Sequence, residues 1–264
     1  FPLATLNKKF DKKLISSTVK KWQPFDFKNT DIDKFLDSLD IDKSVGISSI
    51  EGGYIKASNR FDNFLSEGFS DYAQFSSDPS KNASSQMSPY FHFGHISTHE
   101  VFEKLVKHES WSPEQIKPNL VGRREGWWGG SLNFDSFLDE LITWRELGYH
   151  TCVRRANYNQ YSSLPEWAVK TLQEHATDER EHVYSLDQLT YSETHDEIWN
   201  AAQNQLREQG IIQNYLRMLW GKKILEWSPN PQIALSYMIT LNDRYALDGR
   251  DPNSYSGVFW VLGR

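Results

Sequence analysis

Residues 213–227, QNYLRMLWGKKILEW, place two indoles seven residues apart on one segment. Seven residues are nearly two helical turns, so Trp220 and Trp227 fall on one stripe, about 10 Å apart along the axis. Leu216 and Ile224 lie on the same side, and the segment predicts a helix that stops at the following SPNP. A stripe packed in a core is the simplest interpretation of this pattern.

A second group of side chains lies on another side of the same helix: Asn214, Arg217, Met218 and Gly221. A glycine inside a helix costs about 1 kcal/mol relative to alanine, so Gly221 indicates that something needs the space. A closely packed helix is one explanation, and a flat cofactor is the other. The segment alone leaves both open.

Apolar spacing predicts further helices on both sides of this segment. They cover residues 59–72, 135–149 and 194–209, and a stretch that begins after a cap at Ser97 or Thr98. The helix of 194–209 is expected to open with a capping box, Thr194 and Glu197, and to close at Gly210. The next helix is then expected to start near residue 211.

Loops are expected where polar, glycine or turn-forming residues cluster: 76–89, 122–130 and 241–257. No stretch alternates for long enough to predict a strand, so the expected fold class is all-α. Lysines dominate residues 8–21, which predicts a linker or basic arm over residues 1–30. The rest, residues 31–264, is expected to form one helical domain.

Composition narrows the class of protein. The chain has 264 residues with a mean hydropathy of −0.64, and it contains no apolar run of the ~18–20 residues that span a bilayer. No signal peptide is recognisable, and the first residue is not Met, which favours a fragment boundary. Cys152 is the only cysteine, which excludes an internal disulfide and fits an intracellular compartment. With a net charge of −6, binding to nucleic acid would need a local basic surface.

The segment FLDELITWREL, residues 137–147, carries an arginine within an apolar arc when it is drawn as a regular helix. Asp139, Thr143 and Glu146 take the opposite, wet face. A buried guanidinium needs an anion, so Arg145 is expected to meet either a buried carboxylate or a bound phosphate.

Glu140 and Trp144 share the edge of that arc, one turn apart. They are either rim residues or the wall of a pocket that stacks a planar ligand and bonds its edge. A metal site is not expected, because residues 241–257 lack the ligand spacing of a calcium loop. The histidines nearest to a cluster, His92, His95 and His99, lack carboxylate or cysteine support.

Five blocks of sequence, taken together, resemble the carboxy-terminal FAD-binding domain of the photolyase/cryptochrome family. They are SPYFHFGHIS (88–97), FLDELITWREL (137–147), THDEIWNAAQNQL (194–206), YLRMLWGKKILEW (215–227) and LNDRYALDGRDPNSYSG (241–257). Class II cyclobutane pyrimidine dimer photolyases and neighbouring clades are the most similar, and the resemblance runs in order from about Asp71 to the end. It implies a helical FAD-binding domain, with the amino-terminal antenna domain of the family absent from this chain.

The resemblance implies a site. By similarity, FAD is held by Tyr72, Ser84, Ser85, Gln86, Met87, Ser88, Arg145, Asn214, Arg217 and Asp248. Glu140 and Asn242 are implied to act in catalysis, the first at the dimer and the second near flavin N5. A flipped dimer would contact Trp144, Met218 and Trp260. Electrons would reach the flavin through Trp199, Trp220 and Trp227, which offers a reason beyond packing for the stripe of indoles.

The implied activity is light-driven splitting of pyrimidine dimers in UV-damaged DNA by an intracellular monomer. Two departures from the family pattern stand out: Gln213 where His is usual, and Gln86 where a basic residue is usual. The loop GRREGWWGG (122–130) is also longer than expected for class II. Three rival functions are a cryptochrome-like photoreceptor, a six-four photoproduct photolyase and a helical DNA-binding module without flavin.

Overall fold

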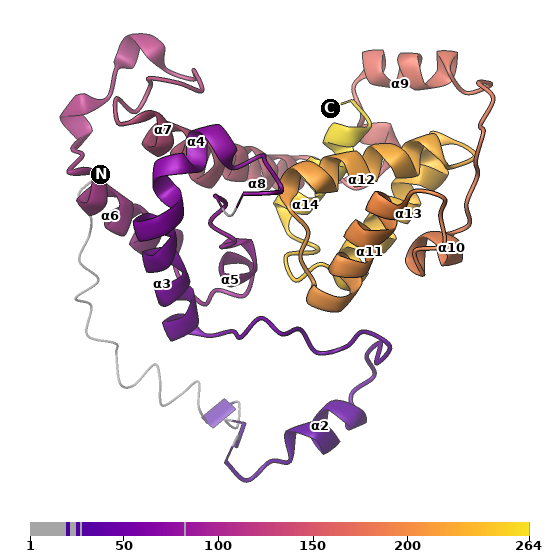
Figure 1. Ribbon diagram of the computed structural model, residues 1–264, viewed down its shortest axis with the longest axis horizontal. Coiled ribbons are helices and arrows are strands. Elements are labelled where there is room, and N and C mark those ends of the chain that lie inside the picture. The colour runs from indigo at the N-terminus through magenta and orange to yellow at the C-terminus, as the bar shows by residue number, and fades with distance from the viewer. Residues whose placement is uncertain (1–19, 22–24, 27, 82, 264) are drawn as a thin grey trace. The chain divides into compact units, whose positions relative to one another are not determined.

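The computed structural model describes residues 20–21, 25–26, 28–81 and 83–263, and Figure 1 shows their course. Every regular element among these residues is a helix and none is a strand, which confirms the all-α class. None of the described helices is both long enough and apolar enough to cross a membrane. The chain divides into two compact units, residues 1–44 and 45–264.

The smaller unit contains helix α2 (Ile32–Ser38), which begins where the Asp31 side chain accepts a hydrogen bond from the Lys34 amide. Most of the basic arm expected over residues 1–30 lies outside the described residues. The division between the units falls between residues 44 and 45, and the domain boundary expected at residue 30 stays a prediction.

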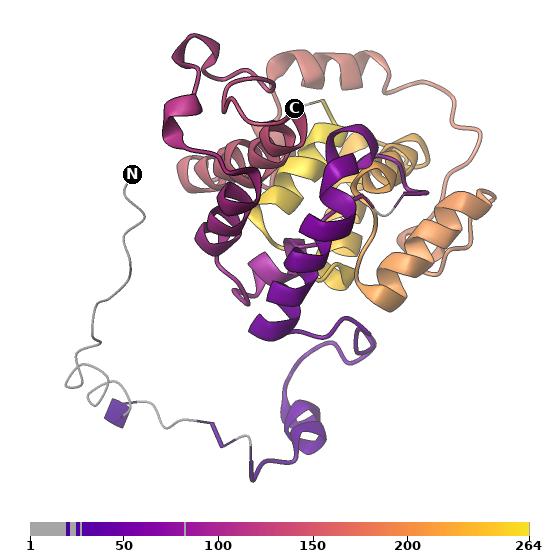
Figure 2. The ribbon, with the colours of Figure 1, turned by 60° about the vertical axis from the view of Figure 1, so that its left-hand side comes forward.

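The larger unit is built from short and medium helices. They are α3 (Tyr54–Asn63), α4 (Tyr72–Phe75), α5 (Ser88–His92), α6 (Thr98–Glu109), α7 (Leu132–Leu138), α8 (Arg145–Arg154), α9 (Glu166–Glu174), α10 (Leu186–Thr190), α11 (Glu197–Gln209), α12 (Asn214–Glu226), α13 (Pro231–Tyr245) and α14 (Pro252–Val261). Two hydrophobic cores form within it, one mainly from α3 to α7 and one mainly from α10 to α14. In Figure 2 the yellow ribbon of α14 lies between α8 and the orange helices of the second core, and α14 packs on both.

Helices α7 and α8 are joined without a break by a π-helical turn, Asp139–Trp144. The helix expected over 135–149 is therefore confirmed, although it runs further, from Leu132 to Arg154. Its wheel is wrong, because a π turn holds more residues than an α turn and shifts the faces. Asp139, expected on the wet face, is 8% exposed and accepts a hydrogen bond from Trp144 Nε1 at 3.0 Å.

The caps agree with the sequence in part. Ser97 caps α6, and Gly210, with φ of 74°, closes α11 as expected. The capping box expected at Thr194 is wrong, because Asp196 stands directly before α11 and accepts from the Trp199 amide instead. Helix α12 begins at Asn214 rather than near 211, after Gln213 accepts from the Leu216 amide.

The loop expected over 241–257 is also wrong over most of its length. Helix α13 continues to Tyr245 and α14 already begins at Pro252, which leaves 246–251 as the connection. Burial of Leu241 and Phe259 against the second core outweighs the local preference of Asn, Asp and Gly for turns. No metal-binding cluster occurs among the described residues.

Gly221 is explained by close helix packing. A Cβ atom there would lie 2.8 Å from Val261 Cγ2 and 3.1 Å from Met238 Sδ, since α13 and α14 both press on α12. Both distances are below ordinary van der Waals contact, so this position has no room for a methyl group.

Gly221→Ala is expected to lower the free energy of unfolding by about 1–3 kcal/mol, because overpacking outweighs the gain in helix propensity. Urea titration of the purified chain measures this. Gly257→Ala on α14 is the matched control, since a Cβ there meets only Met218 Cε at 3.4 Å. A Gly221→Ala midpoint at or above that of the control would contradict the assignment.

Candidate active site

A cavity of about 1350 Å³ opens between the two cores, bordered by α3, α5, the π turn, α12, α13 and α14. Small-molecule pockets usually hold about 300–1000 Å³, so this space can take a dinucleotide-sized ligand and part of another. Sixteen of the predicted site residues line it: Tyr72, Ser84, Ser85, Gln86, Met87, Ser88, Glu140, Trp144, Arg145, Asn214, Arg217, Met218, Trp220, Asn242, Asp248 and Trp260. Trp199 and Trp227 are predicted site residues that do not reach the cavity.

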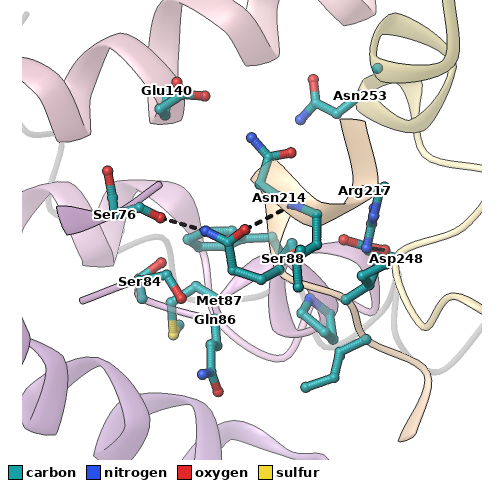
Figure 3. A pocket seen from close by; sticks show the side chains of 18 of the residues that line it. Ser76, Ser84, Gln86, Met87, Ser88, Glu140, Asn214, Arg217, Asp248 and Asn253 are labelled. Carbon is teal, nitrogen blue, oxygen red and sulfur yellow. Dashed lines mark hydrogen bonds and ion pairs between the residues drawn. The ribbon is translucent and has the colours of Figure 1, made fainter. Parts of the chain in front are cut away.

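The serine-rich loop forms one wall, and an arginine that the sequence analysis did not single out supports it. Arg60 of α3 donates from Nε to the Ser85 carbonyl at 3.0 Å and from a terminal nitrogen to the Ser84 carbonyl at 3.4 Å. Gln86 has a positive φ of 54°, and Met87 is 1% exposed within the first core. The loop is thus anchored from behind, and Figure 3 shows it across the cavity from Glu140.

Arg217 and Asp248 form a largely buried ion pair at 3.1 Å on the opposite wall (Figure 3). Burial alone would raise the pKa of Asp248, but the Arg217 charge and a hydrogen bond from Ser88 bring it below its ordinary value. Arg217 Nε is buried and has no hydrogen-bond partner among the described residues. One arm of this guanidinium is therefore fixed by the carboxylate, while a second donor remains for a ligand that accepts hydrogen bonds.

Glu140 and two indoles shape another side of the cavity. Trp144 and Trp260 meet edge to face with ring centroids 5.4 Å apart, and both remain partly exposed. Burial raises the pKa of Glu140, and the neighbouring Asp139 charge raises it further, while Arg124 opposes both effects. Glu140 therefore lines the pocket, and its environment favours the protonated form more than water does.

Arg145 lines the cavity beside Tyr149, whose ring centroid is 4.7 Å from the guanidinium carbon. The guanidinium pairs with the Glu146 carboxylate at 3.6 Å, and the Glu146 side chain is 69% exposed. A buried carboxylate, one of the two partners expected from the sequence, is not seen beside Arg145 in the described part of the chain. A ligand phosphate remains as the expected partner.

Three buried indoles lead away from the cavity in the order Trp220, Trp199, Trp227. The Trp199 and Trp220 rings are parallel with centroids 6.4 Å apart, and the Trp199 and Trp227 centroids are 5.6 Å apart. Trp199 Nε1 donates to the Trp220 carbonyl, and Trp220 Nε1 donates to Gln203 Oε1. Trp199 of α11 thus contacts both Trp220 of α12 and Trp227, the residue that follows α12.

No family model matches the chain. Curated proteins named deoxyribodipyrimidine photo-lyase do match it. That of Oryza sativa subsp. japonica is 40% identical over 202 residues, that of Potorous tridactylus 37% over 225, and that of Methanothermobacter thermautotrophicus 40% over 217. The chain belongs to the photolyase/cryptochrome family. The three matches cover 76%, 85% and 82% of this chain but 36%, 39% and 44% of the respective relatives.

This photolyase homologue therefore spans about two fifths of the length of the curated relatives it matches. Its fold is similar to the crystal structure of a bacterial class III photolyase from Agrobacterium tumefaciens, with a TM-score of 0.57 and 19% sequence identity. That similarity covers 80% of this chain and 38% of the other. It agrees with the helical class expected from the five sequence blocks.

Several residues that line the cavity were not predicted from the sequence. Arg60 and Asn253 line it, as does Arg124 from the loop 122–130. That loop is held by Asp135, whose carboxylate accepts from the Gly126 and Gly130 amides. The sequence of the loop 122–130 offers one clue to the role of Arg124. Two consecutive arginines stand between glycines, and a loop anchored in this way can present a positive charge to a cavity.

Proposed function

We propose that this chain is the FAD-binding catalytic part of a photolyase that splits cyclobutane pyrimidine dimers in light. The proposal rests on the lining of one cavity. Serines and arginines suited to phosphates and a flavin ring line part of it, and two indoles with the Glu140 carboxyl line another part. The names of the curated relatives support this activity. We expect the protein to act on UV-damaged DNA as an intracellular monomer.

The residues present fit FAD. The Ser84–Ser88 loop and Arg145 would hold the phosphates, and Tyr72 would border the ribitol. Arg217, with its unpartnered buried Nε, would donate to the polar edge of the ring system while Asp248 fixes its position. Asn242, 2% exposed at the cavity wall, would face flavin N5. Bound FAD would supply the electron chemistry, and the protein would supply position and field.

The substrate part of the proposal rests on the aromatic wall. A pyrimidine dimer is easier to flip out of the duplex than a normal base pair, because the damage already weakens its pairing. Trp144, Trp260 and Met218 would pack on its apolar side. The Glu140 carboxyl would donate a hydrogen bond to a carbonyl oxygen of the dimer, as its raised pKa favours.

The test is repair of an oligonucleotide with one defined thymine dimer by the purified, FAD-loaded chain, under blue light and in the dark. Repair in light alone supports the proposal. A flavin-loaded protein without repair would favour a photoreceptor, repair of a six-four substrate instead would change the lesion, and a protein that takes up no flavin would remove the proposal altogether.

Glu140→Ala is expected to leave FAD bound and to lower the yield of dimer splitting roughly ten-fold or more, since one preorganised group that stabilises charge on the base is lost. Repair per absorbed photon measures the effect. Glu166→Ala, at an exposed position of α9 that does not line the cavity, should keep the wild-type yield. An unchanged yield in Glu140→Ala would exclude Glu140 from the reaction.

A further inference from the structure

A hydrogen-bonded tyrosine and histidine cover the outer end of the tryptophan row. The Tyr184 ring lies edge to face on Trp227, with centroids 5.5 Å apart, and the His195 ring contacts the same indole at 5.3 Å. The Tyr184 amide also donates to the Trp227 carbonyl at 3.1 Å. These contacts fix both rings against the last indole of the row.

Trp227 itself does not meet solvent. It is 1% exposed, and its Nε1 donates to no other atom among the described residues. Tyr184 is half-buried and His195 is exposed, so these two side chains stand between Trp227 and the surface. An electron can therefore enter the row from the surface through these two side chains.

The hydrogen bonds between the two residues direct the phenol proton. Tyr184 OH lies 2.7 Å from His195 Nδ1, and the His195 amide donates to the phenol oxygen at 3.0 Å. Because the amide already supplies a donor to that oxygen, the phenol hydrogen is left to donate to Nδ1 of a neutral imidazole. A phenol that loses an electron becomes a strong acid, and a base at this distance can take its proton in the same event.

We propose that Tyr184 and His195 together form the terminal electron donor of the tryptophan row, with His195 as the proton acceptor. This rests on the proposed function, with the tryptophan row delivering electrons to the flavin as the family resemblance implies. One electron passes from Tyr184 to oxidised Trp227, the phenol O–H bond breaks, and the proton moves to His195 Nδ1. Trp227 is restored, Tyr184 becomes a neutral phenoxyl radical and His195 becomes an imidazolium. A thiolate in solution then returns one electron, and the proton goes back to the phenol oxygen.

The proton acceptor must be neutral, so the step depends on pH. The other groups near the couple are His182, stacked on His195 at 3.9 Å, Glu181, 3.8 Å from the His182 ring, Asp196, next in the chain, and Lys223, 5.5 Å from the Trp227 ring centroid. A protonated His195 has no lone pair at Nδ1 and could not accept the phenol proton. The tyrosyl yield should therefore be lower in acid than at neutral pH.

Electron paramagnetic resonance with ring-deuterated tyrosine tests the proposal in the full chain. Radicals are generated by light in the FAD-loaded protein and, independently of flavin, by azidyl radicals in the flavin-free protein. Wild type should give a tyrosyl signal, Tyr184→Phe should leave the radical on tryptophan, and His195→Gln should lower the tyrosyl yield at least about ten-fold. His182→Gln keeps a planar group in the stack without touching the phenol hydrogen bond, and it should behave as wild type.

An identical radical spectrum in Tyr184→Phe would overturn the assignment of the donor. A tyrosyl yield in His195→Gln equal to that of the control, or a wild-type yield that does not fall at low pH, would overturn the role of His195. A third outcome separates the two proposals. If light produces no radical but azidyl oxidation still gives the Tyr184 radical, the proposed photolyase function is contradicted, while the pairing of Tyr184 with His195 as electron donor and proton acceptor is supported.

Discussion

Trp199→Phe is expected to stop light-driven reduction of bound oxidised FAD down to the background rate. Trp199 lies between the other two indoles of the row, with ring centroids 6.4 Å from Trp220 and 5.6 Å from Trp227. Phenylalanine keeps an aromatic ring in the core, but its ring is much harder to oxidise than indole. The lost hydrogen bond to the Trp220 carbonyl should cost about 1 kcal/mol of stability, which leaves the protein folded.

The measurement is the bleaching of the oxidised flavin band under blue light with a thiol present. Trp227→Phe should show the same defect, since it removes the next indole outward. Trp167→Phe is the matched control, because that indole is 62% exposed on α9 and does not contact the row. Repair by chemically reduced protein should survive in all three variants, as it takes no electron from the row. Bleaching at the wild-type rate in Trp199→Phe would mean that the three indoles serve packing alone.

Asp248→Ala is expected to release FAD and to lower the free energy of unfolding by about 3–5 kcal/mol. The variant leaves the Arg217 guanidinium buried without its carboxylate, and the guanidinium loses the partner that holds it at the cavity wall. The flavin-to-protein ratio after gel filtration measures the first effect, and urea unfolding of the flavin-free chain measures the second. Asp62→Ala breaks an exposed pair with Lys104 and should cost no more than about 1 kcal/mol.

A double variant separates charge from cofactor binding. Arg217→Met with Asp248→Leu replaces the pair by apolar groups, so most of the lost stability should return while FAD stays unbound. The lowered pKa of Asp248 means that its ionisation stabilises the folded chain above pH about 4 and that this contribution is lost as the pH falls through the folded-state pKa. The stability gap between wild type and Asp248→Ala should therefore narrow in acid. A single variant that keeps its flavin and its urea midpoint would contradict the role given to the pair.

The sequence predicts most of the helices because their signals are local. Ser97 and Gly210 act within one turn of a helix end, and the apolar spacing of 135–149 persists over its whole length. The family resemblance of the five blocks also implies which side chains share a cavity, and residues from α5 to α14 do converge there.

The errors arise where distant packing outweighs local preference. Residues 241–257 read as a loop because Asn, Asp and Gly favour turns, yet burial against the second core keeps both flanking stretches helical. The helical wheel of residues 137–147 misplaces Asp139 because no residue pattern in this segment predicts a π turn. Arg60 is not foreseen because its role consists of hydrogen bonds to carbonyl groups about 25 residues further along the chain, which carry no side-chain signature.

The π turn at Asp139–Trp144 links the number of residues at this point of the chain to the geometry of the site. It holds one residue more than an α turn and so absorbs that residue locally, while α7 and α8 stay continuous. Glu140 and Arg145, five residues apart, can therefore face the same space, whereas in a regular α-helix they would point about 140° away from each other. A homologous chain that lacks this turn should carry the two residues four apart and should therefore show a one-residue gap here.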